Sequence, residues 1–308
     1  MKIEVQSKKS RLFGIGETLA VVAVLCQALA VVSQRAAAIN VNPIVGSFVN
    51  IGPVFFGGLI YLWLSRRTTG SSFGKPTRLA LVASVVGALS SNVIALPILL
   101  KALSLGGAVI VSPIVASTVI WAAVLARVMM GQRLTKYAYF GFGIFGIGLI
   151  LLIVGQMSGA PLSAQWYLAV PLALAVAILY GVTMSLTGYS LANGLSQSGS
   201  IVISGVTGAF GLGVLVVILR QPIAIPLPDA LKLILAGVLQ ASGLIASTAA
   251  FAKTSVLSVA TILVTNIIWT SLLAWAFLGD TLNPLMAIAL GITLCGLILV
   301  QYSRSKRT

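Results

Sequence analysis

The feature that most constrains this chain is a series of long apolar runs in which charged side chains are almost absent. Residues 79–100 and 138–154 are good examples, because neither run contains Asp, Glu, Lys or Arg. Charged residues make up 7% of the whole chain, whereas soluble domains carry about 25%. Each run is about as long as the helix of roughly 20 residues that crosses a bilayer. Because the runs do not alternate apolar with polar residues, they predict membrane helices and not the strands of a membrane barrel.

The runs predict an all-α integral membrane protein with ten transmembrane helices. A linker rich in Gly, Ser and Pro, residues 155–165, separates a first five-helix unit, residues 14–154, from a second, residues 166–302. Basic tails, residues 1–13 and 303–308, flank the two units. The expected spans are residues 14–32, 45–64, 79–100, 108–128 and 138–154 in the first unit, and 166–186, 200–219, 231–252, 257–278 and 285–302 in the second.

The two units are copies of one another. A shift of 148 residues aligns residues 102–151 with residues 250–299 without a gap and places Trp121 on Trp269. Ordered matches of Trp and Gly are not expected from a shared excess of Leu, so the sequence indicates an internal duplication. Since the second unit has its own counterpart of the first helix, cleavage of that helix as a signal peptide near residues 36–38 is the less favoured alternative. Further matched pairs are Gly131/Gly279, Gly143/Gly291 and Gly148/Gly296.

The basic residues predict how the chain is oriented. With the N-terminus in the cytoplasm and ten spans, all but four of the 19 basic residues fall on the cytoplasmic side. Cytoplasmic loops carry such an excess, so the net charge of +15 indicates orientation and not nucleic-acid binding. We therefore expect a multi-pass protein of the cell inner membrane with both termini in the cytoplasm. Five spans per unit is an odd number, so the units are expected to be inverted repeats, as in secondary transporters. The four basic residues expected on the outer side are Arg35, Lys101, Arg220 and Lys232.

A short motif follows the fourth predicted helix of each unit. It reads Gly131-Gln132-Arg133-Leu134-Thr135 in the first unit and Gly279-Asp280-Thr281-Leu282-Asn283 in the second, and a Gly-rich apolar run comes after each copy. Together with Lys101-Ala102-Leu103-Ser104 and Ser112-Pro113, the pattern resembles the EamA-like units of the drug/metabolite transporter superfamily. The resemblance implies a ten-span transporter, in a superfamily that exports or exchanges amino acids, nucleotide sugars, drugs and other metabolites.

Acidic residues are scarce, and Gln132 stands where the family motif usually has an acid. The chain holds only Glu4, Glu17, Asp229 and Asp280, and it has no His. Glu4 lies in the N-terminal tail, and Asp229 and Asp280 are expected in outer connections. Glu17 is therefore the candidate for coupling to a proton or for balancing a cationic solute. Its alternative role is that of a carboxylate stabilised by the partial positive charge of the first helical turn.

Uncharged polar residues recur at matching positions of the two units. The 148-residue shift pairs Asn92 with Gln240, and it also pairs Thr118 with Asn266. Polar side chains at equivalent depth are expected to line a cavity shared by the units, where the matched Trp pair would stack on the solute. The alternative is that the amides and hydroxyls only bond helix to helix. The predicted substrate-binding residues are Gln27, Asn92, Trp121, Tyr180, Gln240, Asn266 and Trp269, of which Gln27 and Tyr180 match at a shift of 153 in the first helices.

These observations favour a transporter, exporting or exchanging small polar metabolites such as amino acids by alternating access. One alternative is an exporter of organic cations or drugs that uses Glu17, and another is a membrane scaffold that transports nothing. Without His or paired acids, we expect neither catalysis nor a metal or cofactor. The expected partners are a small-molecule substrate and the lipid bilayer, with no nucleic acid. A homodimer through the Gly-rich fifth helix, residues 138–154, or tenth helix, residues 285–302, is also expected.

Overall fold

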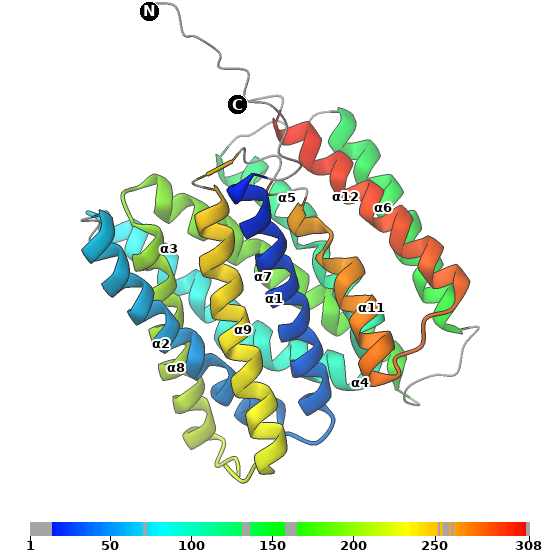
Figure 1. Cartoon of the computed structure of the whole chain (residues 1–308), viewed down its shortest axis with the longest axis horizontal. Helices are drawn as coiled ribbons and strands as arrows, with labels where there is room; N and C mark the ends of the chain where they lie inside the picture. Colours follow the sequence, from blue (N-terminus) through cyan, green and yellow to red (C-terminus); the bar gives the residue numbers. More distant parts are fainter. Residues whose placement is uncertain are drawn as a thin grey trace, which may run out of the picture.

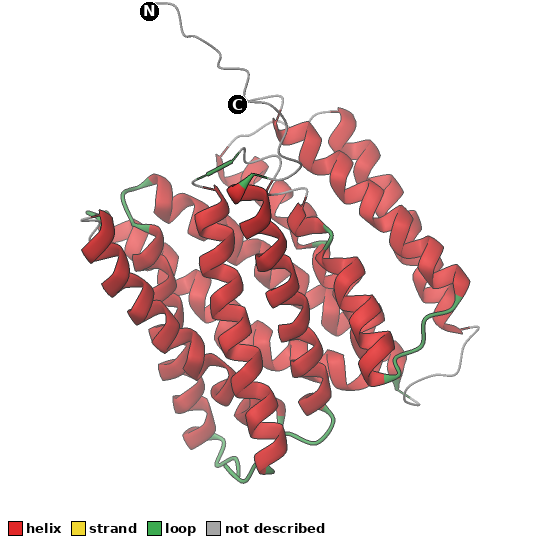
Figure 2. Ribbon diagram, viewed as in Figure 1, coloured by secondary structure: helices red, strands yellow, loops and turns green. Residues whose placement is uncertain are grey.

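The computed structural model shows a bundle of helices (Figure 2). It describes residues 14–69, 73–130, 136–157, 165–251, 253–254, 259 and 262–305. Within these ranges the regular elements are helical, and Gly74 and Leu195 form one isolated bridge. The first half contains α1 (Ile15–Ala38), α2 (Pro43–Thr69), α3 (Arg78–Ala88), the π-helix η1 (Leu89–Ala95), α4 (Leu96–Ala116), α5 (Thr118–Met130) and α6 (Lys136–Met157). The second half contains the 3₁₀-helix η2 (Trp166–Leu168), α7 (Ala169–Ala192), α8 (Gln197–Ile218), α9 (Leu227–Phe251), α11 (Asn266–Leu278) and α12 (Pro284–Ser305).

Seven stretches of the described chain are long and apolar enough to cross a bilayer. Six of them follow α1, α2, α6, α7, α8 and α9, and the seventh runs from Arg78 to Leu125 through α3, η1, α4 and α5. Two shorter apolar helices, Ile262–Leu278 and Pro284–Val300, complete the set. The predicted all-helical membrane protein is therefore confirmed. The count of ten spans and the inversion of the two units stay predictions.

The third and fourth predicted spans are joined differently from what the sequence suggested. A connection at residues 101–107 was expected, but α4 remains helical through most of that interval and kinks at Gly107, which has φ 70° and ψ 171°. Glycine reaches this positive φ without a steric penalty because it has no Cβ. A single residue thus divides the long apolar stretch, and Ala108 begins a new helical segment with a free backbone N–H to satisfy.

Helices from the two halves of the chain pack against each other. α1 packs on α9, α2 packs on α8, and α3, α4 and α5 pack on α7. α6 and α12 form a further pair that lies side by side at one edge of the bundle in Figure 1. The largest buried cluster includes most of the apolar side chains of α4 between Leu96 and Ile114. Any space between the halves is therefore bounded by helices from both.

Several glycines of α6 and α12 lie where these two helices contact each other. A Cβ built on Gly296 would lie 2.5 Å from the backbone nitrogen of Phe145, and one built on Gly141 would lie 2.8 Å from the carbonyl oxygen of Gly296. By contrast, a Cβ on Gly143, Gly146 or Gly291 would meet no atom within 4 Å. The homodimer through these helices stays a prediction. Gly143, Gly146 and Gly291 have the free space beside them that a dimer contact would need.

The α6–α12 contact provides a first test of the packing. Gly296→Val should destabilise the protein by about 1–3 kcal/mol, because overpacking forces backbones apart. The matched control is Gly291→Ala, which should be neutral or slightly stabilising, since Ala favours a helix over Gly by up to about 1 kcal/mol. Thermal unfolding in detergent measures both variants. Equal melting temperatures for the two variants would contradict the packing described above.

Candidate functional site

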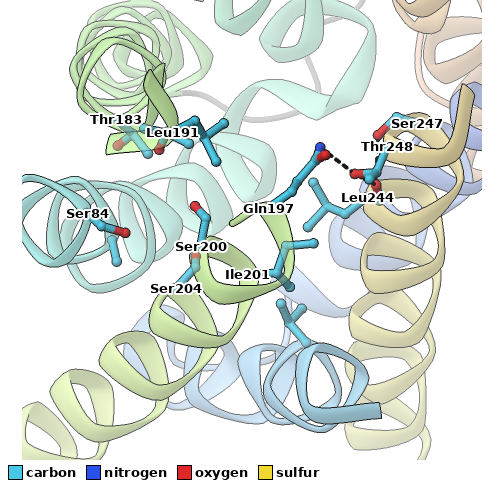
Figure 3. Close-up of a pocket in the computed structure, with 13 residues that line it drawn as sticks. Ser84, Thr183, Leu191, Gln197, Ser200, Ile201, Ser204, Leu244, Ser247 and Thr248 are labelled. Atoms are coloured by element: carbon cyan, nitrogen blue, oxygen red, sulfur yellow. Dashed lines mark hydrogen bonds between the residues drawn. The ribbon is translucent and has the colours of Figure 1, made fainter. Parts of the chain in front are cut away.

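A cavity of about 270 Å³ lies between α2 and α3 of the first half and α7, α8 and α9 of the second. Ligand pockets usually measure about 300–1,000 Å³, so this space suits a small solute and not a drug-sized one. Figure 3 shows the side chains that surround it. They are Val54, Ser84, Ala88, Thr183, Thr187, Leu191, Gln197, Ser200, Ile201, Ser204, Leu244, Ser247 and Thr248.

The lining of this cavity is polar but uncharged. Seven of the lining residues are Ser or Thr, Gln197 adds an amide, and the remaining five are apolar. Hydroxyl and amide groups form hydrogen bonds without the high desolvation cost of a buried charge. A lining without Lys, Arg, Asp or Glu offers no counter-ion for a solute with a net charge. The arrangement therefore suits a neutral or zwitterionic solute.

Several of these hydroxyl groups already have backbone carbonyl acceptors, mostly on their own helix. The hydrogen of Thr183 Oγ1 lies between the carbonyl oxygens of Leu179 on its own helix, at 2.9 Å, and Gly87 on α3, at 2.8 Å. Ser247 and Thr248 Oγ atoms donate to the carbonyl of Leu244 at 2.9 and 2.8 Å. Such local bonds are usual for Ser and Thr inside helices. They leave the oxygen lone pairs of these side chains as hydrogen-bond acceptors at the cavity.

The first two turns of α8 supply one wall, and a cap and a loop contact hold them in place. Ser196 caps the helix, because its Oγ accepts the backbone N–H of Gly199 at 3.0 Å. The backbone N–H of Ser196 donates to the carbonyl of Phe73 at 3.1 Å. The connection between α2 and α3 is thus paired with the connection between α7 and α8. From this wall, Gln197 Nε2 donates to Thr248 Oγ1 on α9 at 2.8 Å (Figure 3).

None of the predicted substrate-binding residues lines this cavity. Asn92 comes nearest, because its Nδ2 donates to Oγ of the lining residue Ser204 at 2.8 Å and to its carbonyl at 3.0 Å. Gln240 accepts a long hydrogen bond, 3.5 Å, from Gln34 Nε2 on α1. Gln27 also lies between α1 and α9, where its Cγ packs against Gly243. The structure thus uses these amides between helices, and their role in binding a solute stays a prediction.

The aromatic and remaining polar positions are also dispersed. Trp121 is half-buried on α5 and packs against Gly181 of α7, whereas its repeat partner Trp269 on α11 is 41% exposed. Tyr180 packs against the main buried cluster. Asn266 Oδ1 accepts a hydrogen bond from Thr270, one turn later on α11. The structure does not bring these residues together around one space. Their role as ligands of a solute stays a prediction.

Glu17 lies in the first turn of α1, as predicted, and it is half-buried. Its Oε1 accepts a hydrogen bond of 2.5 Å from Thr254 Oγ1, near the end of α9. The carboxylate therefore links the start of α1 to the end of α9, and it does not line the cavity. Gln132 of the first motif lies outside the described residues, as do residues 1–13 with Glu4.

The sequence reasoning missed a buried ion pair. Arg35 Nη2 lies 3.4 Å from Asp280 Oδ1, and the two side chains are 7% and 0% exposed. Asp280 was expected in an outer connection. It does lie in a connection, between α11 and α12, but it is buried there, and its place on the outer side stays a prediction. Its Oδ2 accepts the backbone N–H of Ala108 at 2.6 Å, so it caps the helical segment that begins after the Gly107 kink. Gly279, at φ 67° and ψ 20°, ends α11 and turns the chain towards this contact.

Asp229 was likewise expected in a connection, but it lies in the first turn of α9. It is 4% exposed, accepts a hydrogen bond from Asn40 at 3.3 Å, and pairs with Lys232 at 2.7 Å. Lys232 is 42% exposed and reaches water. A basic residue three positions after an acid is a local signal for this pair. No local signal joins Arg35 and Asp280, which are far apart in the sequence.

Comparisons with known proteins agree with this architecture. Residues 14–154 match the model of the EamA-like transporter family. A solved structure described as "Crystal structure of protein" aligns over 95% of this chain and 99% of its own, with a TM-score of 0.65 and 14% sequence identity. At that identity the likeness shows a shared fold alone. A search of curated proteins finds no match. The matched residues coincide with the first unit predicted from the sequence, and this part of the chain is similar to the EamA-like transporter family.

Proposed function

We propose that this protein carries small polar solutes without net charge, such as amino acids, across the cell inner membrane by alternating access. The observation that supports this most directly is the uncharged, hydroxyl-lined cavity between helices of both halves. Secondary transporters with inverted repeats bind their solutes near the midplane, between the repeats. A family of transporters matches the first half of the chain, which fits the same function.

The proposal includes ten spans, in two inverted units, with both termini in the cytoplasm. The odd number of predicted spans per unit and the excess of Lys and Arg on one side support it. Export or exchange is the proposed direction. The cavity lining contains no acid or base, so exchange driven by the solute gradient needs no proton carrier within it.

A counterflow assay tests this function. The purified protein is placed in liposomes loaded with unlabelled alanine, serine or threonine, and the entry of the same labelled amino acid is measured. Entry should exceed that into empty liposomes by roughly tenfold or more, and external unlabelled amino acid should saturate it. Labelled quaternary amines and nucleotide sugars serve as solutes of the wrong charge.

Other results would favour the alternatives. Entry of the amines alone, lost in Glu17→Gln, would support an exporter of organic cations in which the Glu17 carboxylate balances the charge. Entry of no solute, from protein that remains folded, would favour a scaffold without a transport cycle. Either result would overturn the proposed transport of neutral solutes.

A further inference from the structure

The Arg35–Asp280 pair connects the two halves of the chain. Arg35 lies near the end of α1, and Ala108 lies just after the kink of α4, so both belong to the first half. Asp280 follows α11 in the second half and touches both, through the 3.4 Å ion pair and the 2.6 Å hydrogen bond. Alternating access moves one repeat against the other around the solute site. Contacts of this kind must break when the end of the bundle that holds them opens.

The pair lies further than the cavity from the end of the bundle where Glu17 meets Thr254. Gln34, beside Arg35 in the chain, is level with Gln240 of α9 because their side chains bond. The cavity residues Ser247 and Thr248 lie seven and eight residues further along α9, which at 1.5 Å per residue is about 10–12 Å. They lie towards the end where Glu17, at the start of α1, meets Thr254. Arg35 lies beyond Gln34 in the opposite direction along α1.

Further cross-half contacts close the bundle on the side of Arg35. Asn50 Nδ2 on α2 donates to the carbonyl of Leu233 on α9 at 3.2 Å. Asn42 Nδ2 bonds Gln221 Oε1 at 2.7 Å, which joins the connection after α1 to the connection after α8. A Cβ added to Gly237 would strike the carbonyl oxygen of Asn50, so α2 and α9 approach closely here. This end is closed, and the cavity lies nearer the other.

The ion pair between Arg35 and Asp280 is long and leaves donors of Arg35 unsatisfied. Good charge-assisted hydrogen bonds measure about 2.7–2.9 Å, whereas the single contact here is 3.4 Å. Within the described residues, Nε and Nη1 of Arg35 are buried without a hydrogen-bond partner. A buried ion pair gains over its desolvation cost only when the remaining donors are satisfied. The net energy that holds Arg35 and Asp280 together is therefore modest.

We propose that Arg35 and Asp280 form a gate that closes the end of the bundle opposite the cavity. Asp280 positions two elements of the first half at once, the end of α1 and the segment of α4 after Gly107. When the pair separates, the Gly107 kink lets that segment of α4 move independently of the part before it. The gate extends the proposed transport function and rests on it. With the proposed orientation, it faces the outside of the cell.

Cysteine labelling from outside the cell tests the gate. In a background with Cys26 and Cys295 replaced by Ala, Ser200→Cys places a reporter thiol in the cavity. The test variant, Arg35→Met with Asp280→Asn, removes both charges while the Asn oxygen still caps the N–H of Ala108. Replacing a buried ion pair by uncharged groups is often neutral for stability, so this variant should fold. The control is Asp229→Asn, which changes the other buried Asp at this end, leaves the Arg35–Asp280 pair intact and keeps an oxygen that can accept the hydrogen bond of Asn40.

A membrane-impermeant maleimide is added to intact cells, and the labelling rate of Ser200→Cys is measured. The rate should rise by about tenfold or more in the double variant and stay at the parent level in Asp229→Asn. Labelling of solubilised protein confirms that the thiol reacts in every variant. Equal slow rates in the parent and the double variant would overturn the gate, and so would rapid labelling of the parent. Because no solute is needed, failure of the counterflow assay would not produce either result.

Discussion

Asp280→Ala should lower the free energy of unfolding by about 3–5 kcal/mol, the usual cost of removing one partner of a buried ion pair. The substitution leaves the Arg35 guanidinium, 7% exposed, without its acid. It also removes the acceptor for the backbone N–H of Ala108, and an unsatisfied buried donor costs about 1–3 kcal/mol. Equilibrium unfolding in mixed micelles measures the change.

The control for this variant is Asp229→Ala, in which the partner remains free to reach water. Lys232 is 42% exposed, and exposed ion pairs contribute about 0–1 kcal/mol. We therefore expect a loss of about 1 kcal/mol from this change. Asp280→Asn should fall between the two, since it keeps the cap of Ala108 and loses the charge. A loss below about 1 kcal/mol for Asp280→Ala would mean that Arg35 finds another partner or reaches water, contrary to the burial described here.

The helices of this fold could be predicted from the sequence because membrane helices are recognised by the length of their apolar runs. The first run, predicted at residues 14–32, corresponds to α1, and the match of residues 14–154 follows the predicted first unit. The kink at Gly107 could not be placed in the same way. Gly106 and Gly107 are adjacent, and no hydropathy pattern tells which glycine, if either, takes a positive φ.

The contacts between helices were less accessible to sequence reasoning. Asn92 and Gln240 match in the repeat, but Asn92 bonds Ser204 on α8 whereas Gln240 bonds Gln34 on α1. Matching positions have different neighbours because each helix packs on a different partner. The burial of Asp280 was also beyond sequence reasoning. Its position after a helix correctly predicted that it lies in a connection. Its ion-pair partner, Arg35, comes near only because the two halves pack against each other.

The cavity was missed for a related reason. Ser and Thr occur throughout these helices, and many of them bond the carbonyl of the preceding turn, as Ser247 does. Spacing along one helix cannot distinguish such a residue at a cavity from one that faces lipid. Ser242 illustrates this, because it lies on the same helix, donates to Val238 in the same way at 2.8 Å, and is exposed. The difference between the two serines lies in their neighbours alone.

Because Ser247 lines the cavity and Ser242 does not, we expect substitutions at these two positions to differ in their effect on transport. Ser247→Leu should reduce solute counterflow by at least about tenfold, because the larger Leu side chain takes up part of a 270 Å³ cavity and replaces an acceptor by apolar atoms. Ser242→Leu introduces the same side chain on the outer face of α9 and should leave the flux at the parent level. The initial rate of entry, per correctly folded molecule, is the quantity compared in liposomes.

Stability measurements separate loss of the cavity from loss of the fold. The Ser247 hydroxyl bonds only its own helix among the described residues, and a Leu that fills existing space should change the melting temperature little. Ser200→Leu, on the facing wall of α8, should repeat the loss of flux, because it enters the same cavity from another helix. Full flux in both Ser247→Leu and Ser200→Leu would show that the solute passes elsewhere. The amide and Trp positions predicted from the repeat would then be the next candidates, since none of them lines this cavity.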